Sequence, residues 1–377
     1  MVLEAPRRLP LREFARPRID EDDALLKVEA CGLCGTDHEE FSGHLFGGFA
    51  FIPGHESVGV IEEIGDRASR RWGLAVGDRV AVEIFQSCRR CAPCIAGNYR
   101  HCIEHGLSDT YGYIPVDREP GLWGGYAQYQ YLAPDSKLLS VPDSVDPVTA
   151  TLFNPLGAGI RWAATLPGTA EGDVVAVLGP GIRGLCSLVA AKEAGAAFVL
   201  VTGSGPRDHA RLETARRFGA DLVVDVGEGD PVRALVRAAG READVVVDVT
   251  AKAPDALNQA VRLARPGGTV VVAGTRGGDG MSRFNSDALV YKEVHLLGAL
   301  GVQVPSYEAA LALLASRRMP FRRHRPRGRG LRRPRRPPRG PRGGFAGHAA
   351  PQRRGPRLTE PDLSRGSTVR GLAERPS

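Results

Sequence analysis

An alternation of short apolar runs with helical stretches, between about residues 171 and 317, constrains the fold of this 377-residue chain most strongly. Helical stretches are expected at 185–195, 209–218 and 306–317, and buried strands at 174–178, 198–201, 222–226, 244–249, 269–273 and 293–300. Parallel strands need a crossover connection, usually a helix, whereas antiparallel strands do not. The alternation therefore predicts an α/β region with a doubly wound parallel sheet.

The first third of the chain has a different pattern. Three apolar, β-branched runs at 24–30, 57–64 and 79–83 are bounded by Gly and Asp, which is typical of short strands between turns. They predict a small, irregular, β-rich domain that carries its functional residues on loops. The length of the chain is sufficient for about two such cores.

The positive charge of the chain is confined to its C-terminal end. Residues 320–377 contain 17 Arg, no Lys and 3 acidic residues, whereas residues 1–319 contain 33 basic and 40 acidic residues. The net charge of +7 is therefore no argument for nucleic acid, which we do not expect as a partner. Residues 320–377 also contain 10 Pro and 9 Gly without apolar periodicity, a composition that predicts disorder.

Neither a membrane span nor a secretory signal is evident in the sequence. The chain has no run of about 18 apolar residues, and its N-terminus lacks the apolar segment of a secretory signal. We therefore expect a cytoplasmic protein with no membrane contact.

The strongest chemical signal is a group of four cysteines, Cys88, Cys91, Cys94 and Cys102. Each two-residue gap turns the chain back on itself, so that four thiolates can surround one tetrahedral ion. The alternative is a pair of disulfides, which a cytoplasmic location disfavours. The spacing predicts a structural zinc site, closed because all four ligands are sulfur.

A second constellation joins Cys34-Gly-Thr36-Asp37 to Gly54-His55-Glu56. A thiolate and an imidazole from separate loops are suitable ligands for a catalytic zinc ion that keeps an open position. Either motif alone is a weak signal, because a single His beside a Glu is common on any protein. Together with the four cysteines, they predict a second, catalytic zinc site.

A third motif follows the strand at 174–178 and opens a helix. It reads Gly179-Pro-Gly181-Ile182-Arg-Gly184, and its glycines let the backbone approach a pyrophosphate at the helix N-terminus. A lone motif of this form is often only a turn, but the strand before it and the helix after it are the required context. It predicts a dinucleotide-binding site.

Over about residues 20–319, the chain resembles the zinc-dependent medium-chain dehydrogenases. The resemblance rests on five motifs in this order: CGLCGTD, GHE, the four cysteines, GGYAQY at 124–129 and the glycine motif. The resemblance implies a GroES-like catalytic domain at 1–153, a Rossmann domain at 154–319, and an active site between them. It implies hydride transfer between an alcohol or polyol, as the small-molecule substrate, and NAD(P). The substrate's identity is not predicted, and a homo-oligomer is compatible with the sequence.

The resemblance also assigns roles to residues. Cys34 and His55 match the catalytic zinc ligands, and Glu56 matches a carboxylate that lies beside the zinc or binds it. Thr36 matches the hydroxyl that passes the substrate proton toward solvent. Asp37 matches the residue that orients the zinc-bound histidine.

One departure from the family is Asn154, which stands where members have a third zinc ligand, Cys, Glu or Asp, before a Pro-Leu pair. A neutral amide is a poor zinc ligand. Glu56 coordinates instead, or water fills the position, or zinc binds weakly. A further alternative is that Asn154 donates a hydrogen bond to the substrate.

The other departure lies at the end of the second strand of the alternating region. An NAD-dependent dehydrogenase often has an Asp there for the ribose hydroxyls, but this chain has Gly203-Ser204-Gly-Pro-Arg207. Ser204 and Arg207 could hold a 2′-phosphate, which favours NADP. Asp208 stands on an expected loop that could fold back, so NAD remains open.

Residues 320–377 are anomalous for this family. Members continue past the position of Met319 with a segment that returns to the catalytic domain, and 321–377 cannot form it. Abundant Arg, Pro, Gly and Ala without Lys is what a GC-rich gene yields out of frame, so a reading-frame shift near codons 319–322 is our first hypothesis. The competing hypothesis is a genuine basic tail that binds nucleic acid or an acidic surface. For the function, the alternatives to an active dehydrogenase are a damaged, inactive family member and a protein that binds a polyanion through this tail.

Overall fold

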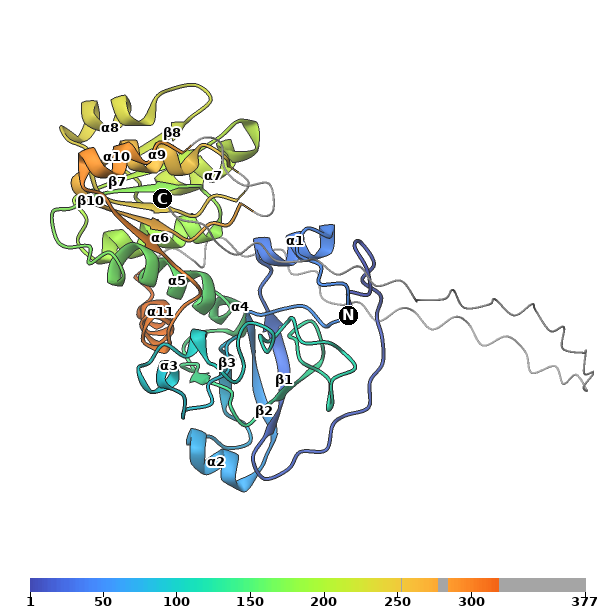
Figure 1. Ribbon diagram of the computed structural model, residues 1–377. Helices are drawn as coiled ribbons and strands as arrows, with labels where there is room; N and C mark the ends of the chain where they lie inside the picture. Colours follow the sequence, from blue (N-terminus) through green and yellow to red (C-terminus); the bar gives the residue numbers. More distant parts are fainter. Residues whose placement is uncertain (252, 277–283, 319–377) are drawn as a thin grey trace, which may run out of the picture. The chain divides into compact units, whose positions relative to one another are not determined.

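Two β-sheets organise the described residues, 1–251, 253–276 and 284–318, of the computed structural model (Figure 1). The first sheet is antiparallel, with the order β4-β1-β2-β3-β5. Its strands are β1 (Ala24–Cys31), β2 (Ser57–Ile64), β3 (Arg79–Val82), β4 (Tyr129–Leu132) and β5 (Leu138–Ser140). The three strands expected from the sequence are confirmed, and the short strands β4 and β5 were not predicted.

Helices and loops around this sheet carry the residues that the sequence singled out. They are α1 (Gly35–Ser42), α2 (Asp66–Trp72), α3 (Ala92–Ile95), a 3₁₀ turn (Tyr99–His101) and α4 (Pro147–Ala150). Next comes α5 (Phe153–Ile160), which continues as one π-helical turn (Arg161–Thr165). The long segments between β3 and β4 therefore form loops, as expected for a β-rich domain with functional loops.

The second sheet is parallel throughout, with the order β8-β7-β6-β9-β10-β11. Its strands are β6 (Val174–Leu178), β7 (Phe198–Gly203), β8 (Leu222–Asp225), β9 (Ala243–Asp248), β10 (Ala264–Val272) and β11 (His295–Gly298). In chain order this is 3-2-1-4-5-6, the Rossmann arrangement. Ligands of such sheets bind at the carboxyl ends of the strands where the order reverses, which here is between β6 and β9.

Helices cover both faces of the parallel sheet. They are α6 (Ile182–Glu193), α7 (Pro206–Arg217), α8 (Pro231–Ala239), α9 (Ala256–Leu263), α10 (Asp287–Lys292) and α11 (Val304–Ser316) (Figure 1). Alternate residues of β6 belong to different hydrophobic clusters: Val175 and Val177 lie in one, and Val174 and Ala176 in another. This alternation is why every residue of β6 is apolar and buried, and it confirms the doubly wound sheet.

One hydrophobic cluster joins the two sheets. It contains Val58 and Leu139 of the antiparallel sheet, Val177 of the parallel sheet, and Leu311 of α11. Helix α11 contacts α5, α4 and β5, so it packs against the antiparallel region as well. The two regions therefore share buried apolar surface, which holds their functional residues together.

One prediction from the sequence is corrected by the structure, and another concerns residues outside the described ranges. Asp208 was expected on a loop, but α7 begins at Pro206, three residues earlier than predicted, because a proline at the first helical position has its backbone angle preset for a helix. The predictions about residues 320–377 lie outside the described residues. Within the described ranges, no helix combines the length and apolar character needed to span a membrane.

Candidate active site

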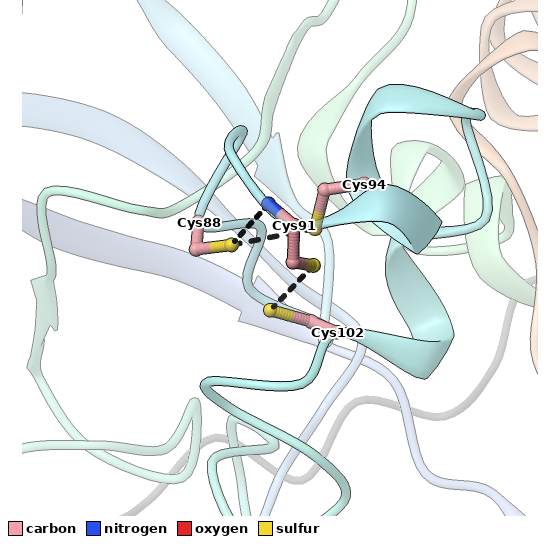
Figure 2. A group of neighbouring side chains, drawn as sticks. All are labelled: Cys88, Cys91, Cys94 and Cys102. Atoms are coloured by element: carbon pink, nitrogen blue, oxygen red, sulfur yellow. Dashed lines mark hydrogen bonds between the residues drawn. The ribbon is translucent and has the colours of Figure 1, made fainter.

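Four cysteine sulfurs converge in the segment 88–102, which we call the four-cysteine loop (Figure 2). Cys88 Sγ lies 3.9 Å from Cys94 Sγ, and Cys91 Sγ lies 4.0 Å from Cys102 Sγ. All four sulfurs lie within 4.8 Å of one another. A tetrahedron with zinc–sulfur bonds of about 2.3 Å has edges of about 3.8 Å, so the spacing fits one zinc ion.

The disulfide alternative is contradicted by these distances. A disulfide needs a sulfur–sulfur separation of about 2.05 Å. All seven cysteines lie in the described part of the chain, and all are free. The sulfurs face one another without bonding, which is the arrangement that a metal ion requires.

Local interactions shape the four-cysteine loop. Arg89 has a φ of +61°, in the left-handed region that costs most residues about 1–2 kcal/mol. Its guanidinium donates to the carbonyl oxygens of Pro134 and Ser136, at 3.2 and 3.3 Å, which offsets that cost. The backbone N–H of Cys91, the N-cap residue of α3, donates to Cys88 Sγ at 3.4 Å. The turn thus presents both sulfurs to the same point.

Cys34 and His55 are brought together from separate loops, before α1 and before β2. The distance between Cys34 Sγ and His55 Nε2 is 3.2 Å. Cys34 is the N-cap residue of α1, and its sulfur accepts the backbone N–H of Thr36 at 3.2 Å. A helix N-terminus stabilises negative charge, so this position favours a thiolate.

Charges at this pair agree with that assignment. Burial would raise the pKa of the Cys34 thiol, but the hydrogen bond with His55 and the positive charges of His55 and Arg183 lower it to about 6. Burial would lower the pKa of His55, but the thiolate raises it to about 9. Both shifts favour a thiolate paired with an imidazolium when no metal is bound. A zinc ion would replace the imidazolium proton, since metal ligands must be deprotonated.

Buried carboxyl oxygens surround the pair. Asp37 Oδ2 accepts the backbone N–H of Cys34 at 2.7 Å, and Asp37 Oδ1 lies 3.7 Å from His55 Nδ1. Asp37 Oδ1 and Glu56 Oε1 are buried and have no hydrogen-bond partner among the described residues. Such orphaned oxygens are rare in native proteins, and a bound cation would account for them. The donor set around Cys34 and His55 therefore fits a zinc ion.

Two carboxyl groups here have strongly raised pKa values. Burial, together with the negative charge of Cys34, raises the pKa of Glu56 to about 7. Burial and the charge of Asp37 raise the pKa of Glu40 to about 8. Glu40 lies one helical turn after Asp37 on α1, and the sequence analysis did not single it out. Glu56 was expected beside the zinc, and its Oε1 lies 4.0 Å from the Arg183 nitrogen that contacts Cys34. The ligand atoms that converge within 4.8 Å of one another are those of Cys34, Asp37 and His55.

Both polar atoms of the Asn154 side-chain amide form hydrogen bonds with protein side chains. Its Oδ1 accepts a hydrogen bond from Arg183 Nη2 at 3.2 Å, and its Nδ2 donates to the Tyr307 hydroxyl at 3.3 Å. The same Arg183 nitrogen lies 3.9 Å from Cys34 Sγ and 4.0 Å from Glu56 Oε1. A guanidinium therefore stands beside the Cys34–His55 pair, next to Asn154, for which the resemblance implied the position of a third zinc ligand.

Tyr307 extends this network to the buried carboxyl group of Glu83, which directly follows β3 of the antiparallel sheet. Its hydroxyl donates to Glu83 Oε1 at 3.4 Å, and the Tyr99 hydroxyl donates to Glu83 Oε2 at 2.6 Å. Burial raises the pKa of Glu83 to about 7. The network thus links α11 and α6 to the loop after β3.

Sequence reasoning missed Arg183, Tyr307 and Glu83. One signal was present for Arg183, because it stands in the first turn of α6, where the helix dipole disfavours a cation. A cation in an unfavourable position indicates a specific partner. No comparable signal marks Tyr307 or Glu83, since their pairing spans 224 residues and depends on tertiary packing.

The glycine motif forms a cradle between β6 and α6, and we call residues 179–184 the glycine cradle. Gly179 has a φ of +101°, and a Cβ at Gly184 would overlap the carbonyl oxygen of Gly179. Gly181 is the N-cap residue of α6, and no side chain in the described ranges caps its N–H groups. Ile182 is exposed. This geometry fits the pyrophosphate of a dinucleotide, which needs free N–H groups and close backbone approach.

At the end of β7, Gly203 is buried while Ser204 and Arg207 are exposed. Asp208 folds back toward the strand, as the NAD alternative required, and its Oδ2 accepts the backbone N–H of Ser204 at 3.0 Å. Its Oδ1 accepts from Arg211 at 2.9 Å. The carboxylate is thus occupied by protein donors, whereas the side chains of Ser204 and Arg207 face solvent.

Two family models match the chain. The Alcohol dehydrogenase GroES-like domain matches residues 20–143, and the Zinc-binding dehydrogenase model matches residues 184–316. The first match covers both cysteine constellations, and the second begins in the glycine cradle. The two matches follow the division of the chain between the antiparallel and the parallel sheet.

Individual proteins with known names or structures are also similar. A probable alcohol dehydrogenase of Mycobacterium tuberculosis is 66% identical over 322 residues, which cover 85% of this chain and 88% of that protein. A probable D-xylulose reductase A of Arthroderma otae is 32% identical over 328 residues, covering 84% and 86%. A structure from Sinorhizobium meliloti 1021, assigned to the zinc-binding dehydrogenases and bound to NADP, is 28% identical with a TM-score of 0.73, covering 84% and 87%.

Proposed function

Because the chain belongs to the zinc-binding, medium-chain alcohol dehydrogenase family, we propose that it binds two zinc ions, one at Cys34, His55 and Glu56 and one in the four-cysteine loop. The protein is an oxidoreductase that transfers a hydride between an alcohol or polyol and NAD(P). The comparisons favour this activity over a role as a polyanion-binding protein.

One observation carries the assignment of the site. The glycine cradle and the Cys34–His55 pair come from different sheets, yet Arg183 of the cradle reaches within 3.9 Å of Cys34 Sγ. A dinucleotide in the cradle and a substrate at the pair would therefore meet. Hydride transfer requires this, because the reacting atoms must be in contact.

Each residue of the site has a separate role in alcohol oxidation. Zinc, when bound, supplies a Lewis acid that lowers the pKa of the substrate hydroxyl. Asp37, close to His55 Nδ1, orients the imidazole. Thr36 is exposed and lies two residues after Cys34, so its hydroxyl can pass the substrate proton to water.

Asn154 is better suited to hold Arg183 than to ligate zinc or to bind the substrate. Its carbonyl oxygen and its amide group are both engaged by protein side chains. Glu56 has a buried oxygen without a hydrogen-bond partner among the described residues, and this makes Glu56 the better third ligand.

For the cofactor we propose NADP over NAD. Gly203, Ser204 and Arg207 follow directly on β7, where the exposed Ser204 and Arg207 could hold a 2′-phosphate, and the Asp208 carboxylate already accepts two protein donors. A relative of 28% identity was solved with NADP bound. A polyol substrate is suggested by the D-xylulose reductase relative, and a homo-oligomer in the cytoplasm remains a prediction.

The test combines metal content with turnover. The purified full-length protein should contain two zinc ions per chain by elemental analysis. It should oxidise members of a panel of secondary alcohols and polyols, with a higher kcat/KM for NADP⁺ than for NAD⁺. Absence of turnover with every alcohol, in protein that holds both zinc ions and binds cofactor, would contradict the proposed substrate class.

A further inference from the structure

Arg183 holds a positive charge in a place where a helix disfavours one. It is the second residue of α6, and a helix N-terminus carries the equivalent of about half a positive charge. Three side chains hold its guanidinium there. Its Nη2 donates to Asn154 Oδ1 at 3.2 Å and lies 4.0 Å from Glu56 Oε1, and its Cζ lies 5.2 Å from the centroid of the Trp162 ring. A locally unfavourable residue with this much support is expected to have a function.

The location of Arg183 limits what that function is. Its backbone belongs to the glycine cradle, and its Nη2 lies 3.9 Å from Cys34 Sγ. The guanidinium therefore faces the metal-binding pair, where the reacting carbon of a substrate comes. The pyrophosphate of a dinucleotide is separated from its nicotinamide by a ribose. The nicotinamide ring is therefore the group of a bound cofactor that would come near the guanidinium.

We infer that Arg183 sets the balance between oxidised and reduced cofactor on the protein, an inference that rests on the proposed function. During alcohol oxidation, the carbon gives a hydride to the nicotinamide ring and the hydroxyl gives its proton to solvent, which leaves a carbonyl product. The ring is positively charged before this transfer and neutral after it. A fixed guanidinium beside the ring repels the oxidised form and has little effect on the reduced form.

Neighbouring groups do not cancel this effect. Cys34, Asp37 and Glu56 can each carry a negative charge near the same place, but a bound zinc ion would neutralise most of that charge. Removing the guanidinium would therefore remove a repulsion and strengthen binding of the oxidised cofactor.

The test measures binding without turnover. Dissociation constants for NADP⁺ and NADPH are measured by calorimetry on the full-length, zinc-loaded protein without alcohol, and the NADPH value is checked by its fluorescence. In Arg183→Met, the ratio of the NADP⁺ constant to the NADPH constant should fall by about tenfold. A ratio that stays within twofold of the unmodified protein, with both cofactors bound, overturns the inference.

Two controls separate charge from packing. Arg183→Lys keeps the charge and should keep the ratio within about twofold. Arg237→Met removes an exposed charge from α8 and should leave both constants unchanged. Circular dichroism and thermal unfolding establish that each variant is folded. If Arg183→Met does not fold, Arg183→Gln, which is neutral and can still donate to Asn154, gives the same test.

The outcome also distinguishes this inference from the proposed function. If the unmodified protein binds neither NADP⁺ nor NADPH, nor the NAD⁺ and NADH pair, the proposed function itself fails. If both forms bind but the ratio does not respond to the charge at residue 183, only the inference about Arg183 fails.

Discussion

The four-cysteine loop and the Cys34–His55 site both bring sulfur together with other possible metal ligands, but they are built differently. The loop takes its four donors from fifteen consecutive residues, and its sulfurs lie close to one another and accept local hydrogen bonds such as that from the Cys91 backbone N–H. The Cys34–His55 site takes its groups from loops of one sheet and a helix of the other, and it mixes a thiolate, an imidazole, carboxyl groups and a guanidinium. Four sulfur donors would fill every coordination position of a zinc ion, so a substrate could not reach it. The mixed set at the Cys34–His55 site could leave one coordination position open, and it contains groups that can act on a substrate.

This comparison predicts the largest effect at Cys34. Cys34→Ser should lower kcat by about 10³-fold or more, because zinc loses a ligand at the reacting centre. Affinity for NADPH should change little, since the glycine cradle is untouched and the reduced ring is neutral. The measurement is steady-state turnover together with calorimetric titration of NADPH.

The unfolding midpoint of Cys34→Ser should also stay within a few degrees of the unmodified protein. Retention of full activity by this variant would rule out zinc-assisted chemistry at the pair, and the two metal-binding regions would no longer differ in function.

Cys88→Ser should instead act on stability. A four-sulfur site contributes folding free energy directly, so losing it should lower the unfolding midpoint by about 10 °C and release one zinc ion per chain. Differential scanning calorimetry and elemental analysis measure both quantities. An unchanged midpoint with one zinc ion lost would show that the four-cysteine loop is not structural.

Cofactor selectivity should depend on a single exposed charge. Arg207→Ala should raise the KM for NADP⁺ roughly tenfold and leave that for NAD⁺ nearly unchanged, because a charge-assisted contact contributes about 1.5–3 kcal/mol. NAD⁺ serves as the internal control, since it lacks the 2′-phosphate. Better use of NAD⁺ than NADP⁺ by the unmodified protein would contradict the proposed preference.

The smallest effect concerns a histidine beside the four-cysteine loop. His105 lies 3.0 Å from Asp109 and 2.9 Å from Asp135; burial would lower its pKa, but these carboxylates raise it above its usual value. A raised pKa stabilises the folded state below about pH 6.5, and this contribution is lost as the pH rises through the folded pKa.

His105→Asn should therefore cost about 1 kcal/mol of unfolding free energy at pH 6 and clearly less at pH 9. Urea unfolding at the two pH values measures the difference. An equal cost at both would mean that the charge on His105 contributes nothing to the stability of this region.

The same contrast explains what could be predicted from the sequence. The parallel sheet follows from apolar runs that alternate with helices, and the four-cysteine loop follows from spacing alone, because both patterns are local. Strands β4 and β5 were missed because four and three residues are too short to show a period. Asp208 was placed on a loop because the helix-starting role of Pro206 was not recognised.

The candidate active site could be predicted only in part. Cys34, His55 and Glu56 lie in recognisable motifs, and their neighbourhood was expected. The contacts of Arg183 with Asn154 and of Asn154 with Tyr307 span 29 and 153 residues, so only packing of the two regions creates them. The spacing of residues within one segment contains no information about a contact between residues that are far apart in the chain.

The bond between Tyr307 and Glu83 has a consequence for how the chain matures during synthesis. The two residues are 224 positions apart, and ribosomes add about 5–20 residues per second. Glu83 is therefore made about 10 to 45 s before the tyrosine that completes its surroundings. During that interval the Glu83 carboxyl group has to stay hydrated. The apolar surface of the first sheet that α11 later covers is exposed to solvent. A nascent chain in this state exposes apolar surface that is prone to aggregation, and the bonds of Tyr307 with Asn154 and Glu83 can form only when synthesis has passed residue 307.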